Sequence, residues 1–139
     1  MKRRAWLAIV PLTCTLACGR HEASAKDVRS VLAESASLAS ESETFIEYVG
    51  QGRSTQKFAR GHLQYLLTEI EQTYQEASRF HSVPSLMNAL EVDRAQLRLL
   101  ELELNNVSSD LKRDSTAQNA SAKRIQEIRI TLQKMNSSL

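Results

Sequence analysis

Histidine, cysteine and carboxylate side chains most often carry catalysis or hold a metal, and this chain has few of them in useful patterns. None of its three histidines, His21, His62 and His81, follows a glutamate three residues earlier, the spacing by which many helical bundles bind metals. The chain also has no Gly-x-x-x-x-Gly-Lys phosphate loop and no Gly-x-Ser-x-Gly nucleophile elbow. We therefore predict that the protein is not an enzyme and needs no metal or other cofactor.

A few polar and aromatic side chains still need an interpretation. A helical hairpin would place His62 near Glu41, and we favour an ordinary position at the edge of the core over a metal or acid–base role. Asp93 interrupts an otherwise apolar helical stripe. We favour a position at the open end of a bundle over the alternative, a buried polar group that sets the helix register. The three tyrosines are interpreted as half-buried packing residues: Tyr48, Tyr65 and Tyr74.

The charge of the chain argues against nucleic acid as a partner. The formal net charge is +2, but removing Lys2, Arg3 and Arg4 leaves 15 basic against 16 acidic residues. A nucleic-acid-binding domain normally keeps a basic surplus in its folded part. Arg53, Lys57 and Arg60 do form a small basic group, for which we favour a solvated helix face over contact with anionic lipid headgroups.

The first residues are built like a secretion signal. Lys2, Arg3 and Arg4 form a positive start, and residues 5–17 are thirteen uncharged, mostly apolar residues. That stretch is shorter than the about 20 residues that span a bilayer, but it suits the apolar region of a signal peptide. We predict a signal peptide over residues 1–17.

The residues Leu16-Ala17-Cys18, followed by Gly19, resemble the lipobox of bacterial lipoproteins, although Thr15 stands where Leu, Val or Ile is usual. The resemblance implies cleavage between Ala17 and Cys18, acylation of Cys18, and attachment to the membrane through that lipid. Gly19 in second place favours the outer membrane, facing the periplasm. Residues 18–26 would then be the lipidated cysteine and a short tether.

A second cleavage site competes with the lipobox. Ala23-Ser24-Ala25 has the small-x-small pattern of ordinary signal peptidase cleavage, and its use would release a soluble chain that begins at Lys26. Cys14 and Cys18 are the only cysteines. We therefore expect no disulfide in the folded domain with either cleavage.

The elements that must position these side chains are helices. Apolar residues recur every three or four positions through four segments, and no segment alternates with a period of two. We predict helices over about residues 25–49, 54–81, 85–112 and 117–136, with Ser54 or Thr55 as the cap of the second. Residues 27–139 would form one all-α domain, an antiparallel four-helix bundle of two helical hairpins. Two extended hairpins, or coiled-coil association with a second copy, are the alternatives.

Charge and side-chain size predict how these helices meet. Residues 21–49, 53–81, 85–114 and 116–139 carry net charges of −4, +1, −2 and +3, so helices adjacent in sequence attract each other. In the first hairpin, Gly61 lies opposite Ser42. Because both residues are small, we predict the closest helix–helix approach there.

These features together favour a binding protein. We predict a small membrane-anchored envelope lipoprotein that acts as a non-enzymatic binding, scaffold or accessory module. Its partners would be the membrane, through the lipid, and a partner protein or a second copy of the chain. The alternative is a soluble secreted or periplasmic bundle, cleaved after Ala25, that binds a small ligand or a partner protein.

Overall fold

The computed structural model describes residues 21–111 and 115–139, and the predicted signal peptide and Cys18 lie outside these residues. The described chain forms four helices, α1 (Ala25–Gly50), α2 (Gln56–Arg79), α3 (Pro84–Ser109) and α4 (Ser115–Ser138). Two short strands, β1 (His21–Glu22) and β2 (Phe80–His81), pair in parallel. The all-α prediction is confirmed, and the described residues contain no cysteine.

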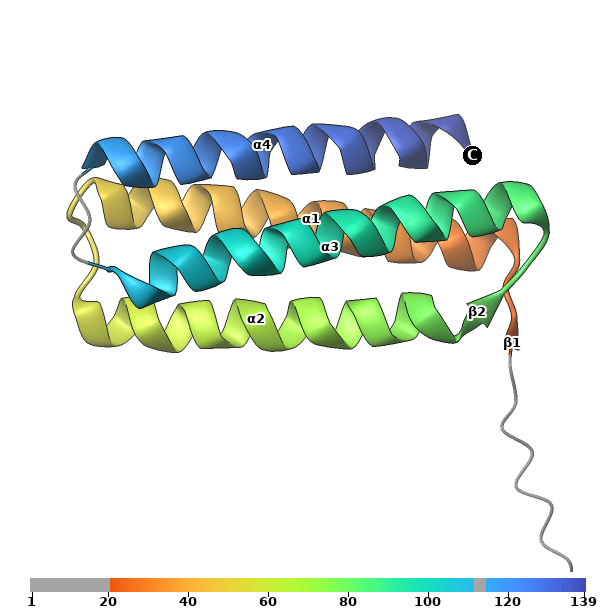
Figure 1. The fold of residues 1–139 in the computed structure, drawn as a ribbon, viewed down its shortest axis with the longest axis horizontal. Coiled ribbons are helices and arrows are strands. Elements are labelled where there is room, and N and C mark those ends of the chain that lie inside the picture. Colours follow the sequence, from red (N-terminus) through yellow and green to blue (C-terminus); the bar gives the residue numbers. More distant parts are fainter. Residues whose placement is uncertain (1–20, 112–114) are drawn as a thin grey trace, which may run out of the picture.

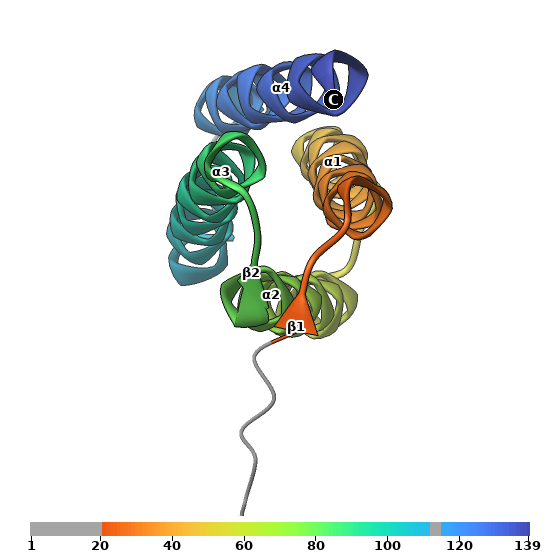
Figure 2. The same cartoon turned by 90° about the vertical axis from the view of Figure 1, so that its right-hand side faces the viewer.

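The helices run antiparallel in sequence order and enclose one core (Figures 1 and 2). α1 and α4 form the most extensive interface, and α2 and α4 lie diagonally opposite each other. Each helix buries one stripe of apolar side chains, so the core runs the length of the bundle. Its largest fully buried members come from all four helices: Leu32, Ile46, Leu63, Leu66, Ile70, Leu90, Leu97, Leu100, Leu104, Ile125 and Leu132. Among the described residues, no helix has the length and apolar composition needed to cross a membrane.

Helix ends follow from local chemistry. Thr55 caps α2 by accepting a hydrogen bond from the backbone N–H of Phe58 at 3.3 Å, as one of the two predicted caps. Pro84 opens α3, where its missing N–H costs nothing. Two helices end earlier than predicted: α2 ends at Arg79 rather than 81, and α3 ends at Ser109 rather than 112. α2 ends early because Phe80 is already extended and belongs to β2.

The predicted site of closest approach is wrong. Gly61 is exposed, and a Cβ added to it would meet no atom within 4 Å. The tight contact is instead between α1 and α4, where a Cβ on Gly50 would lie 3.1 Å from Oε1 of Gln118. Electrostatics supports the same pairing, because Nε of Arg129 on α4 lies 2.7 Å from Oε2 of Glu43 on α1. The most negative helix therefore packs against the most positive one.

We expect Gly61→Ala to stabilise the protein by about 0.5–1 kcal/mol, because glycine in an exposed helix interior costs backbone entropy. Space is available for the methyl group, and Gly61 does not have a positive φ. Gly52→Ala is the matched control. Gly52 has φ +69°, so alanine there should destabilise by roughly 1 kcal/mol. Urea unfolding measures both changes, and a destabilised Gly61→Ala variant would contradict the open environment of Gly61.

Candidate functional site

The chain entering the bundle is held by a clamp, which we define as β1, Ala23 and Ser24 together with β2 and Ser82. The backbone N–H of Ala23 donates to the carbonyl of His81 at 2.7 Å. The Ser82 hydroxyl donates to the carbonyl of Ala23 at 2.8 Å, and Ala23 is only 4% exposed. Part of the predicted tether, from residue 21 onward, is therefore built into the domain.

Ser24 fixes the start of α1 through a capping box. Its backbone N–H donates to Oδ2 of Asp27 at 2.9 Å, and the N–H of Asp27 donates back to the Ser24 hydroxyl at 3.3 Å. These bonds satisfy donors that a helix start otherwise leaves unpaired. The Ala23-Ser24-Ala25 motif thus spans a buried alanine, a helix cap and the first helical residue.

An aromatic cluster lies on the outer side of α2, and we call Phe58, His62 and Tyr65 the α2 patch. The Phe58 and His62 rings stack at 5.9 Å between centroids, and His62 and Tyr65 are 5.7 Å apart. His62 also packs 4.2 Å from the buried ring of Phe45. Its Nε2 lies 3.3 Å from Oε1 of Glu41, which confirms the predicted proximity of these two residues and the position at the core edge.

The α2 patch is open to solvent and bordered by cations. Phe58 is 58% exposed and Tyr65 is 49% exposed, so Tyr65, predicted as a half-buried packing residue, has about half of its surface open to solvent. Tyr48 is also exposed, with the Arg53 guanidinium 5.4 Å from its ring centroid. A shallow hollow beside Gly61 is lined by Thr55, Lys57, Phe58, Gly61, His62 and Tyr65. Large exposed aromatic side chains beside cations are typical of surfaces that contact a partner protein or a membrane.

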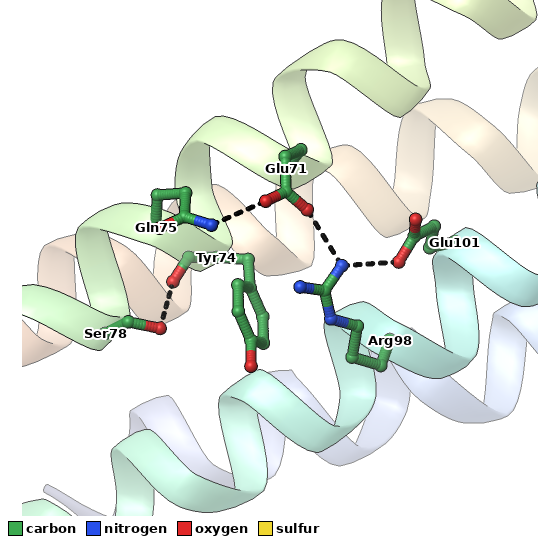
Figure 3. Close-up of polar contacts among 6 residues, drawn as sticks. All are labelled: Glu71, Tyr74, Gln75, Ser78, Arg98 and Glu101. Atoms are coloured by element: carbon green, nitrogen blue, oxygen red, sulfur yellow. Dashed lines mark hydrogen bonds and ion pairs between the residues drawn. The ribbon is translucent and has the colours of Figure 1, made fainter.

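Tyr74, in contrast, is half-buried as predicted and belongs to a joint between α2 and α3. Figure 3 shows the Arg98 guanidinium beside its ring, with the guanidinium carbon 3.6 Å from the ring centroid. Nη1 of Arg98 also donates to Glu71 at 2.8 Å and to Glu101 at 2.7 Å. Hydrogen bonds from Gln75 and then Arg98 lower the pKa of Glu71. The partners of Arg98 lie on α2 (Glu71 and Tyr74) and on α3 (Glu101), so this cluster connects the two helices.

Asp93 is completely buried, so its predicted position at the open end of the bundle is wrong. Within the described residues, neither carboxyl oxygen has a hydrogen-bond partner, and the hydroxyls of Ser35 and Ser42 are also buried without one. Burial, the largest effect, raises the pKa of Asp93 to about 7, although the nearby hydroxyl of Ser35 and the positive charge of Arg94 lower it. The nearby Glu34 raises the pKa further. Asp93 is thus a buried polar group in the apolar stripe.

A second surface hollow lies between α3 and α4. Its lining combines apolar and charged side chains: Gln96, Leu99, Glu103, Arg124, Glu127, Ile128 and Thr131. Arg124 spans the two helices with Nε 2.7 Å and Nη2 2.9 Å from the two carboxylate oxygens of Glu103. Leu102, 56% exposed, lies on the same helix as the exposed Leu99. The hollow therefore presents one leucine, Leu99, beside the Arg124–Glu103 ion pair.

The remaining predicted sites fall partly outside the described residues. Ala17 and Cys18, the predicted cleavage and lipidation residues, belong to that part, as does Cys14. Within residues 21–111 and 115–139, no three His, Cys, Asp or Glu side chains are grouped so that they could hold a metal ion. Sequence reasoning missed the clamp, because a two-residue strand leaves no periodicity to detect.

Comparisons of the chain with protein-family models, curated proteins and solved structures give no match.

Proposed function

We propose that the mature protein is a bacterial envelope lipoprotein, anchored through acyl chains on Cys18, whose helical bundle is a non-enzymatic binding or scaffold module. The proposed place is the periplasmic side of the outer membrane. The clamp is the observation that carries this proposal. Cleavage before Cys18 keeps the clamp, whereas cleavage after Ala25 would remove β1, the buried Ala23 and the Ser24 cap. A chain cleaved at the second site would lose part of its own fold.

The hollow between α3 and α4 supports the binding role. Leu99, a large exposed apolar side chain of α3, lines the hollow, and the Arg124–Glu103 pair in the same lining offers charges of both signs. A mixed surface of this kind suits a partner protein. A pull-down from solubilised membranes at native abundance should recover that partner, and Leu99→Glu, which changes a residue lining the hollow, should lose it. Recovery of the protein alone would count against a scaffold role.

The anchor is tested by the intact mass of the mature protein from fractionated cells. We expect a triacylated chain that begins at Cys18 in the membrane fraction, because two or more acyl chains make attachment stable. Cys18→Ala should move the protein out of that fraction. A chain that begins at Lys26 in the soluble fraction would remove the lipoprotein proposal.

The clamp makes a separate prediction about stability. The free energy of unfolding should be about 0.5–2 kcal/mol lower for a chain that begins at Lys26 than for one that begins at residue 18 with Cys18→Ala, because the shorter chain lacks the helix cap. Ser24→Ala in the longer chain isolates the cap and should reproduce most of that loss. Denaturant unfolding measures all three proteins, and equal stability of the two chain lengths would show that residues 21–24 contribute nothing to the fold.

A further inference from the structure

The N-terminal strand β1 lies on the α2 side of the bundle (Figure 2). β1 lies next to β2 at the C-terminal end of α2. In both views, β1 and α2 occupy the side of the bundle opposite α4 (Figures 1 and 2). Three peptide links separate Cys18 from His21, so these residues are at most about 11 Å apart. Any lipid on Cys18 therefore holds the α2 side of the bundle close to the bilayer.

The outermost line of α2 suits a lipid surface. It consists of exposed residues on the helix face opposite the buried stripe, and none of them is a carboxylate: Lys57, Gly61, Gln64, Thr68, Gln72, Gln75 and Arg79. The helix contains three glutamates, at positions 69, 71 and 76, but helical geometry places them to either side of this line. Cations lie near both ends of α2, with Lys57 and Arg60 at the start and Arg79 at the end.

The α2 patch adjoins the first half of that line. Rings that are apolar on their faces and polar at one edge favour the boundary between acyl chains and headgroups. Helical spacing places the exposed Phe58 and Tyr65 on one side of the line and Arg60 on the other, with Lys57 on the line itself. A bilayer along this line would meet both kinds of side chain that an interfacial helix uses. Apolar side chains enter the boundary, and cations contact anionic headgroups.

We propose that α2 lies along the surface of an anionic lipid bilayer, with the α2 patch and Lys57 and Arg60 in contact with it. This inference rests on the proposed function, because it assumes an anchor at Cys18. Charge alone would favour α4, since residues 116–139 carry a net charge of +3. The anchor selects α2 instead, because β1 lies on the α2 side and leaves α4 facing away from the membrane. The hollow between α3 and α4 stays open to a partner.

Two features of the sequence allow a direct test. Trp6, in the predicted signal peptide, is the only tryptophan, and Cys18 is the only cysteine after residue 17. The chain from Cys18 can therefore be coupled through its thiol to a maleimide lipid in vesicles of phosphatidylcholine and phosphatidylglycerol with brominated acyl chains. Because the anchor is supplied chemically, the result does not depend on acylation in the cell, which the intact mass tests separately.

Phe58→Trp and Ile130→Trp then report on opposite sides of the bundle. Both positions are exposed, at 58% on α2 and 39% on α4. We expect the F58W tryptophan to be blue-shifted and quenched several-fold more strongly than the I130W tryptophan. Lys57→Gln with Arg60→Gln should reduce that quenching several-fold. Tyr65→Trp provides a second probe of the same side if F58W does not fold, as judged by circular dichroism.

Three outcomes would overturn the proposal. Stronger quenching of I130W would place α4 on the membrane, and equal quenching of both would mean that the bundle has no preferred side. No quenching at either α2 position would mean that the α2 patch does not touch lipid and is free for a partner protein or a second copy of the chain.

Discussion

Asp93→Asn is expected to stabilise the protein by about 4 kcal/mol at pH 8 and to change its stability little at pH 4. Asp93 is completely buried, and its pKa is raised from 3.8 to about 7. Each pKa unit corresponds to about 1.4 kcal/mol between the two protonation states. Asparagine has nearly the same shape as the protonated carboxyl group but cannot ionise. The variant therefore avoids the cost of a buried charge.

The direction of the pH dependence follows from which state holds the proton. Between about pH 4 and pH 7 the native state keeps Asp93 protonated while the unfolded state is ionised, so unfolding releases a proton. The contribution of Asp93 to the free energy of unfolding is therefore complete below about pH 4. It falls as the pH rises and is lost above about pH 7. Urea unfolding of the wild type and of Asp93→Asn across this range measures the difference directly.

The control is Glu91→Gln, which removes an exposed carboxylate from the same helix. Its effect should stay within about 0.5 kcal/mol at every pH, as for most surface substitutions. A stability difference between Asp93→Asn and the wild type that does not change with pH would show that Asp93 stays ionised in the fold. In that case the Ser35 hydroxyl and the charge of Arg94 would have to offset the cost of burying the carboxylate.

The second large effect is expected at the α1–α4 interface, where Ala39→Leu should destabilise the protein by about 1–3 kcal/mol. Ala39 is completely buried. Helical spacing places it on the same face of α1 as Glu43 and Gly50, both of which contact α4. A larger side chain there must push the two helices apart or leave its preferred rotamer, because a well-packed core has no free volume.

Ala33→Leu is the matched control, since Ala33 is an exposed alanine on the same helix. It should change the free energy of unfolding by less than about 0.5 kcal/mol. Thermal or denaturant unfolding of the two variants compares the same substitution at buried and exposed positions. If Ala39→Leu were as stable as Ala33→Leu, the α1–α4 contact would have to be loosely packed.

The helices and their order could be predicted, because they depend on local information. The stripes of apolar residues repeat with the helical period, and Thr55 and Pro84 begin helices for reasons that involve only near neighbours. Short loops then require antiparallel neighbours. The contact between His62 and Glu41 was predictable for the same reason, because a short turn determines the register of one hairpin.

The contacts between distant segments could not be predicted. Periodicity shows which residues of a helix are buried, but it does not show which of three other helices covers them. Gly61 and Ser42 therefore looked like a close approach, whereas the tight contact joins α1 to α4. The clamp depends on a backbone pairing between residues 21–22 and 80–81 that leaves no side-chain pattern.

By itself, the sequence determined that this protein is a bundle of four antiparallel helices with opposite charges on helices adjacent in the chain. Only the tertiary structure decided that α1 pairs most closely with α4, that Asp93 is completely buried, and that Phe58 and Tyr65 lie on the surface. The physical reason is that helix formation is a local property, encoded over three or four residues. The burial of a given side chain depends on all the helices around it, and that arrangement is settled by packing across the whole bundle.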